Sequence, residues 1–185
     1  MRGLPWSAMR KKLEHEYICD ALKGRITYFV TRYRKSHDAE GRAAVLLDGK
    51  EILQSSWFIW ARNQTEIYYS TRGSANASLT REEYWNMVET EILNQGGFDQ
   101  LCFYNAFHKY DNQSVEKSLQ DTDPIVRLFS VLDRRVGKRT LLKIKPTISE
   151  QPGWLQPFYI LRLESENIGG TGTPWSPHIA AHLME

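Results

Sequence analysis

The pair Asp48-Gly49 constrains the fold of this 185-residue chain more than any other feature. It separates two apolar runs, RAAVLL before it and KEIL after it. Asp and Gly both tolerate positive φ angles at the central positions of a tight turn, and such a turn matches the twist of antiparallel strands. The sequence therefore predicts a β-hairpin centred on these two residues.

A further strand precedes the hairpin. RITYFVTRY, residues 25–33, alternates two sets of side chains and is rich in β-branched and aromatic residues, which is typical of a strand. The polar run 35–41 predicts a loop, and KEILQSSWFIWARN, residues 50–63, predicts a third strand. QTEIYYSTRGSANAS, residues 64–78, is compatible with either a fourth strand or a loop, and its second half has the composition of a connector. We thus expect an antiparallel meander of three or four strands over about residues 25–70.

Helical periodicity dominates the rest of the chain. Ser7 is placed to cap a helix over residues 7–22, and Thr80 and Glu83 have capping-box spacing before another apolar stripe. Asp123-Pro124 is typical of a helix start. Further helical segments are expected at residues 98–110, 114–119, 124–137, 139–144 and 152–166.

These elements predict an α+β architecture. We expect a single domain over residues 1–168, with an N-terminal helix, the meander, and a mainly helical half over about residues 80–166 that covers one sheet face. The tail, residues 169–185, is rich in Gly, Thr and Pro and is expected to be weakly structured.

Composition indicates a soluble protein. Apolar residues make up 41% of the chain, and mean hydropathy is −0.51. No window approaches the ~18 consecutive apolar residues of a membrane span, and the N-terminus lacks a signal-peptide core. Cys19 and Cys102 both fall in apolar settings, which favours buried free thiols. We expect a cytoplasmic location and no membrane partner.

The charge distribution is asymmetric along the chain. Residues 1–75 hold 13 lysines and arginines against 8 acidic residues, whereas residues 76–185 hold 11 against 14. A local excess of positive charge favours anionic partners. The candidate binding residues are therefore the cations of TRYRKSHDAEGR and DRRVGKR, together with the one histidine: Arg32, Arg34, Lys35, His37, Arg42, Arg134, Arg135, Lys138 and Arg139.

Two interpretations of these basic segments are open. Arginines interleaved with Tyr28 and Tyr33 suit phosphate contact combined with base stacking, so the two segments are expected to form one basic surface that binds nucleic acid. The alternative is an internal ion network, in which Asp133 pairs with an arginine of the meander. The first interpretation describes a binding or accessory module.

A metal-dependent nuclease or phosphohydrolase is a second functional hypothesis. Asp38, followed by Asp48 and Lys50, has the form D…D-x-K, in which the carboxylates hold Mg²⁺ and the lysine orients a water. The residue between Asp48 and Lys50 is a glycine within a turn signature, which favours turn chemistry over a metal site. His37-Asp38 resembles half of an HD-type site, without the further helical His-Asp pair.

A third hypothesis is binding of a protein or a small ligand through Trp57, Trp60 and neighbouring aromatic residues. The two tryptophans are three residues apart, so on the expected third strand they face opposite sides of the sheet. At least one of them then needs a cover, supplied by the helical half or by a second subunit.

Three long motifs resemble one known family. They are LKGRITYFVTRYRKSHDAEGRAAVLLDGKEI, IVRLFSVLDRRVGKRTL and FYILRLESE, which together touch most of residues 6–166. They are similar to an uncharacterised family of small bacterial proteins with the patterns TRYRxxHDxxGR…DGKEI and LDRRVGKRxL. The resemblance implies a bacterial, cytosolic, single-domain protein and carries no established activity. Residues 54–95 lie outside these motifs.

Overall fold

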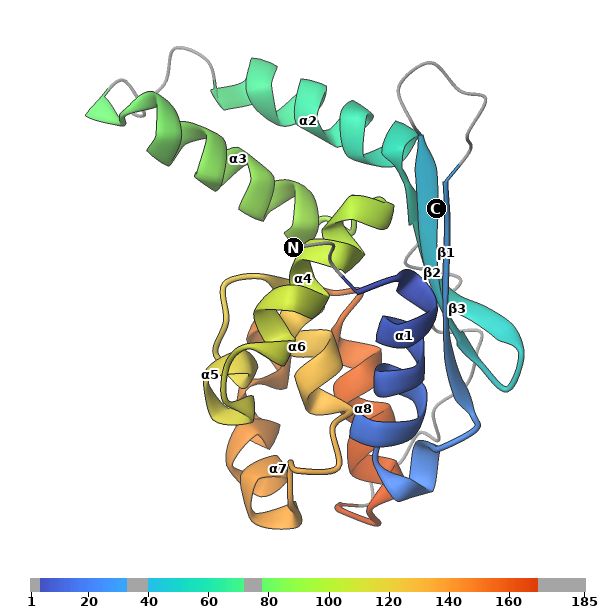
Figure 1. The fold of residues 1–185 in the computed structure, drawn as a ribbon. Coiled ribbons are helices and arrows are strands. Elements are labelled where there is room, and N and C mark those ends of the chain that lie inside the picture. The colour runs from blue at the N-terminus through green and yellow to red at the C-terminus, as the bar shows by residue number, and fades with distance from the viewer. Residues whose placement is uncertain (1–3, 33–39, 72–77, 170–185) are drawn as a thin grey trace.

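The computed structural model describes residues 4–32, 40–71 and 78–169 (Figure 1). It has an N-terminal helix, one three-stranded antiparallel sheet and a mainly helical remainder, which confirms the predicted α+β class. The elements in chain order are α1 (Trp6–Lys11), η1 (Lys12–Tyr17), η2 (Asp20–Leu22), β1 (Ile26–Arg32), β2 (Gly41–Leu47), β3 (Lys50–Ser56), α2 (Trp57–Thr71), α3 (Arg81–Asn94), α4 (Gln100–Asp111), α5 (Val115–Leu119), α6 (Pro124–Val131), α7 (Lys138–Ile144), η4 (Lys145–Glu150) and α8 (Gln156–Ser165).

The sheet has the order β1-β2-β3. Its hairpin turn is the predicted one, because Asp48 and Gly49 have φ angles of 50° and 80° and directly join β2 to β3. Two positive φ angles in a row are the signature of the turn that suits a two-residue hairpin. The register places Phe29 opposite Ala44, and Thr31 opposite Arg42.

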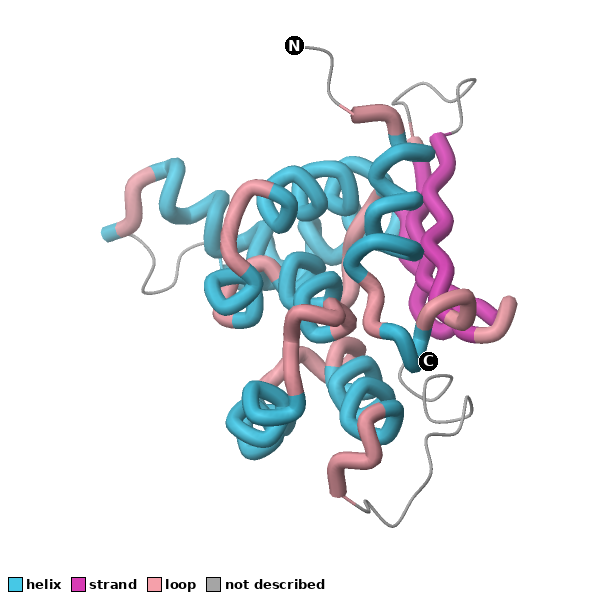
Figure 2. Tube along the Cα trace, turned by 60° about the horizontal axis from the view of Figure 1, so that its bottom comes forward, coloured by secondary structure: helices cyan, strands magenta, loops and turns pink. Residues whose placement is uncertain are grey.

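The helices lie on one face of the sheet, which forms one side of the molecule (Figures 1 and 2). Alternate strand residues, among them Ile26, Tyr28 and Val45, are buried against these helices. Phe129 of α6 lies at the centre of this core, with edge-to-face contacts to Tyr28 and Phe103. The described helices do not include one with the length and apolar content needed to cross a membrane.

The N-terminal helix differs from the predicted one at both ends. It begins after Pro5, which provides no side-chain cap, so the proposed Ser7 cap is wrong. Its second half, η1, is wound as a π-helix, and the helix ends at Tyr17 rather than at residue 22. The next residue, Ile18, forms an antiparallel bridge with Asp133, and this pairing takes the backbone out of the helix.

The predicted continuation of the meander beyond residue 56 is wrong. Residues 57–71 form α2, so the third strand ends at Ser56 and no fourth strand forms within the described residues 64–71. β3 pairs with β2, whose first residue is Gly41, and the ladder therefore has no partner for residues past Ser56. One side of α2 instead packs against α3, where Ile67 meets Val88 and Ile92.

Two other helix starts have their predicted caps. Thr80 and Glu83 form a complete capping box, and Asp123 accepts hydrogen bonds from the first backbone N–H groups of α6. However, α6 ends at Val131 and not at Gly137. Residues 132–134 instead pair with residues 17–19, through Cys19 N–H to Leu132 O and Arg134 N–H to Tyr17 O.

Helices α2 and α3 form an antiparallel pair that projects from the rest of the molecule (Figure 1). Their small apolar cluster is separate from the main core and consists of Ile67, Val88 and Ile92, with Trp60, Tyr84 and Met87 at its margin. We call this pair the arm. Gly97 allows its close approach to the body, since a Cβ there would lie 2.8 Å from Ile92 Cγ2 and 2.9 Å from Asn63 Nδ2.

Candidate functional site

The face of the sheet that points away from the helices carries one half-open aromatic ring. Phe29 is 40% exposed, whereas its neighbour Tyr28 is buried on the helix-covered face. The Arg42 guanidinium lies over the Phe29 ring, with its carbon 5.0 Å from the ring centroid. The β1–β2 register places these two side chains diagonally across the strands, within reach of a cation–π contact.

Arg42 also contacts polar residues of β3. It donates hydrogen bonds to the Glu51 carboxylate and, at 3.0 Å, to Gln54 Oε1. These contacts fix the guanidinium on the open face. Arg32 is exposed at the end of β1, next to the Thr31–Arg42 pair. The other predicted residues of this segment, Arg34, Lys35, His37 and Asp38, lie outside the described residues.

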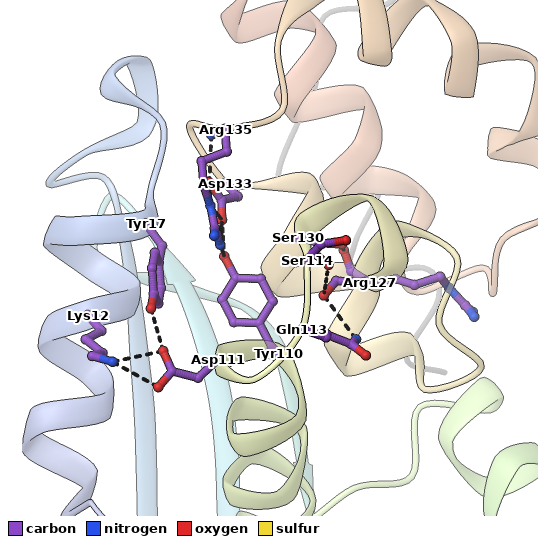
Figure 3. Close-up of polar contacts among 11 residues, drawn as sticks. Lys12, Tyr17, Tyr110, Asp111, Gln113, Ser114, Arg127, Ser130, Asp133 and Arg135 are labelled. Atoms are coloured by element: carbon purple, nitrogen blue, oxygen red, sulfur yellow. Dashed lines mark hydrogen bonds and ion pairs between the residues drawn. The ribbon is translucent and has the colours of Figure 1, made fainter.

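In the second basic segment, Asp133 organises a buried polar cluster (Figure 3). Its carboxylate has no exposed surface, and it accepts hydrogen bonds from the Tyr110 hydroxyl and from the guanidinium of Arg135. Arg135 Nη2 lies 2.6 Å from Asp133 Oδ2, and the backbone N–H of Arg135 lies 2.7 Å from Oδ1. The prediction that Asp133 pairs with an arginine of the meander is wrong for the described residues, since its arginine is the near neighbour Arg135.

The electrostatics of this cluster follow from its geometry. Hydrogen bonding to Asp133 holds the pKa of Arg135 above its usual range. Burial, reinforced by the Asp133 charge, raises the pKa of the Tyr110 hydroxyl. The Arg135 guanidinium carbon also lies 4.9 Å from the centroid of the Tyr17 ring. A cation bonded in this way to a fully buried carboxylate stabilises the fold, because removing it leaves an uncompensated buried charge.

A second part of the same cluster joins the N-terminal helix to α4 (Figure 3). Lys12 Nζ lies 2.9 Å from both oxygens of Asp111, and the Tyr17 hydroxyl donates to the same carboxylate. The edge-to-face contact between Tyr17 and Tyr110 connects the two parts. Lys12, Tyr17 and Asp111 were not among the residues singled out from the sequence, and no local pattern brings residues almost 100 positions apart together.

The other cations of DRRVGKR have different surroundings. Arg134 and Arg139 are exposed, and Lys138 Nζ lies 3.9 Å from Glu166 Oε2. This segment adjoins Tyr17 and Ile18, at the end of the N-terminal helix nearest the start of β1. Arg32 ends the same strand, about 20 Å away at the usual rise of a strand. The described residues of the two basic segments therefore lie near opposite ends of β1 and do not form one continuous surface.

Asp48 and Lys50 occupy the hairpin tip. The Asp48 carboxylate is held by Arg25, with Nη2 to Oδ2 at 2.7 Å, and this hydrogen bonding lowers the pKa of Asp48. Gly41, which starts β2, lies at the opposite end of that strand from Asp48. Among the described residues, no group of three or more His, Cys, Asp or Glu side chains is arranged to hold a metal ion.

Trp57 and Trp60 lie on the first turn of α2, not on a strand. Three residues apart on a helix, they share one side, so the expectation that they face opposite ways is wrong. Both are half-buried and line a hollow of about 270 Å³ with the start of α4. Their cover is therefore this chain's own helical half.

Comparison with known proteins identifies a family. No curated protein and no solved structure matches the chain. The sequence model of the SF0329 protein family matches residues 5–163, a range that includes the open sheet face, the Asp133 cluster and the arm. That range also includes residues 54–95, which lie outside the three motifs. Because the match extends over most of its length, the chain belongs to the SF0329 protein family.

Proposed function

We propose that this protein is a binding module that contacts single-stranded nucleic acid through the open face of its sheet. The observation that carries the proposal is the Phe29–Arg42 pair, an exposed ring beneath a fixed guanidinium on a face that no described helix covers. Bases stack on exposed aromatic rings, and arginine forks contact phosphates. Stacking on one ring contributes about 1–3 kcal/mol per base.

The surrounding charges support an anionic ligand. The segment between β1 and β2 includes Arg34 and Lys35 in its sequence, and Arg32 is exposed at the end of β1, although strand alternation places its side chain on the side of Tyr28. Glu51 shares the Arg42 guanidinium, so a bound phosphate competes with Glu51 for this side chain. Binding of this kind releases counterions from the nucleic acid, and affinity therefore falls as salt rises.

The test is a titration of labelled single- and double-stranded oligonucleotides at about 50 and about 200 mM salt. We expect tighter binding of the single strand, and weaker binding for both Phe29→Ala and Arg42→Ala. The matched controls are Phe58→Ala and Arg62→Ala, which remove an exposed ring and an exposed arginine from the arm. A thermal melt of each variant separates lost binding from lost folding.

Two outcomes contradict this proposal. Absence of binding at low salt by a folded protein removes nucleic acid as the partner. Cleavage of the oligonucleotide with Mg²⁺, lost in Asp38→Ala and Asp48→Ala, favours the metal-dependent nuclease or phosphohydrolase instead.

The two cysteines support a cytoplasmic location as part of the proposal. Cys19 is buried and Cys102 is half-buried, and neither forms a disulfide. Burial raises the pKa of both thiols, which keeps them protonated and unreactive. Free thiols are typical of a reducing compartment. Fractionation of cells that express the chain checks this, and recovery outside the cytoplasm contradicts it.

A further inference from the structure

A long hollow runs between the arm and the body of the molecule. One part, of about 740 Å³, is lined by Met87, Glu89, Glu91 and Leu93 of α3 and by Lys109 and Asp123 of the body. The other part, of about 270 Å³, is lined by Trp57, Trp60, Glu89, Asp99 and Leu101. Glu89 lines both parts, so they adjoin along α3. We call the two parts together the arm trough.

The trough carries an excess of negative charge. Its acidic residues are Glu89, Glu91, Asp99 and Asp123. Among the described residues that line it, the one cation is Lys109, which is already paired with the buried Asp121 at 2.5 Å. Asp99 and Asp123 cap helices through backbone N–H groups. Glu89 and Glu91 are exposed, and neither forms an ion pair within the part of the chain that the structure describes. Gln95 Nε2 donates a hydrogen bond to Glu91 Oε1 at 2.9 Å, and both carboxylates remain exposed to a cationic ligand.

Apolar surface accompanies this charge. Trp57 and Trp60 present half-buried rings at one end, and Leu101, beside them, is 56% exposed. Half-buried Met87 lines the other end, with the edge of Leu93, most of which is buried in the main core. Tryptophan rings attract cations through their electron-rich faces, so the rings and the two glutamates both favour a positively charged ligand.

We infer that the arm trough binds a basic peptide segment of a partner protein, one that alternates cationic and apolar side chains. The cations are recognised by Glu89, Glu91 and the two tryptophans, and the apolar side chains by Met87, Leu93 and Leu101. Two adjoining hollows of this size exceed what a single amine fills, which favours an extended segment over a small cation. This surface is separate from the open sheet face, and the inference does not depend on nucleic-acid binding.

The experiment uses the full chain and a fluorescently labelled peptide of arginines and leucines. Two matched peptides carry glutamate or serine in place of arginine. We expect the arginine peptide alone to bind at low salt, and the indole N–H signals of Trp57 and Trp60 to shift in NMR spectra. The indole signal of Trp6, which packs against Tyr104, is expected to stay in place.

Charge variants on one helix provide the control. Glu89→Gln combined with Glu91→Gln should weaken peptide binding about fivefold or more, the effect of losing partly solvated ion pairs. Glu82→Gln removes the same charge from an exposed position of α3 that lines neither hollow, and should change affinity less than twofold. Because all three side chains are exposed, these variants should fold like the parent.

Four results overturn the inference, three of them from peptide binding. Those three are equal binding of the glutamate peptide, an equal effect of Glu82→Gln, and absence of any peptide binding by folded protein. A fourth is self-association: if sedimentation without peptide shows a dimer that Glu89→Gln dissociates, a second copy occupies the trough. None of these results bears on oligonucleotide binding, which is measured separately through Phe29 and Arg42.

Discussion

Asp133 is a charged residue with no contact with solvent, and each of its two carboxylate oxygens accepts a hydrogen bond. Tyr110 and Arg135 supply those donors, and the backbone beside Asp133 pairs with Ile18. One residue thereby connects the N-terminal helix, α4 and the end of α6. Arg135 is exposed over 45% of its side chain, so the same guanidinium could serve the fold, a ligand or both.

Neighbouring arginines separate these roles. Arg135→Ala leaves the buried Asp133 carboxylate without its cation, and we expect the free energy of unfolding to fall by on the order of 3 kcal/mol. Arg134→Ala removes an exposed side chain and retains the backbone bond to Tyr17 O, so its effect should stay within about 0.5 kcal/mol. Urea unfolding measures both. If the two variants lose equal stability, Arg135 has no special structural role.

Gly49 tests the hairpin turn. Its φ of +80° is strained for a side chain with a Cβ, although a Cβ there would meet no atom within 4 Å. Gly49→Val should therefore cost about 1–2 kcal/mol through the backbone alone. Gly49→Asn, whose side chain tolerates this conformation, should cost clearly less. Thermal melts compare the two, and equal melting temperatures would contradict the strain explanation.

At the scale of elements, the N-terminal helix is attached to the sheet and to α4 by polar contacts. Glu14, buried within η1, accepts a hydrogen bond from the Tyr28 N–H at 2.7 Å. Tyr28 lies on an edge strand, where this donor has no strand partner on that side, and the carboxylate satisfies it. Lys12 and Tyr17 hold Asp111 on α4. Together these contacts fix the helix between two partners.

The Asp111 contacts make stability depend on pH. Burial alone would raise the pKa of Asp111, but hydrogen bonds from Tyr17 and Lys12 outweigh it and lower that pKa. Hydrogen bonding to Asp111 raises the pKa of Lys12. Because the pKa of Asp111 is lowered, its contribution to stability is present above the unfolded pKa near about 4 and is lost as pH falls. Because the pKa of Lys12 is raised, its contribution is present below about pH 10 and is lost as pH rises.

Asp111→Asn should remove the acidic part of this dependence. We expect the variant to be less stable than the parent at pH 7 by about 1–2 kcal/mol, and the difference to shrink as pH falls below about 4. Urea unfolding at a series of pH values measures this. The control, Asp20→Asn, changes an exposed carboxylate on η2. A constant difference between parent and Asp111→Asn across the series would contradict the linkage.

The whole molecule combines a sheet, a helical body and the arm (Figure 1). The main core joins the sheet to the body and includes Leu93 of α3, whereas the rest of the arm packs in its own small cluster of Ile67, Val88 and Ile92. Elements with few buried apolar contacts open at lower free energy than the core. The open sheet face and the arm trough therefore differ in the stability of their surroundings. The sheet face lies on the main core, whereas the trough lies beside a separately packed pair of helices.

Hydrogen exchange measures this difference. Backbone amides of α2 and α3 should exchange at least about tenfold faster than those of α6, which is buried on most sides. Ile92→Ala should accelerate exchange in the arm and leave α6 nearly unchanged. Equal protection of arm and α6 would instead show that the two unfold as one unit.

Short-range chemistry accounts for what could be predicted from the sequence alone. Asp48-Gly49 determines the hairpin because both residues tolerate positive φ, and Thr80, Glu83 and Asp123 determine helix starts because their side chains bond to backbone N–H groups two or three residues away. Such signals act within a single turn of chain. The α+β class follows from them.

Only the tertiary structure decided the features that depend on distant partners. The local pattern predicts a strand for residues 57–63 and either a strand or a loop for the residues that follow. Within the described residues, however, β2 pairs with β3 only as far as Ser56, and α3 offers an apolar face, so a helix forms. Arg135 bonds to a carboxylate two residues away because that carboxylate is buried among Tyr110 and the chain near Ile18. Both arrangements are determined by packing between segments that are far apart in the chain. No local sequence pattern predicts such packing.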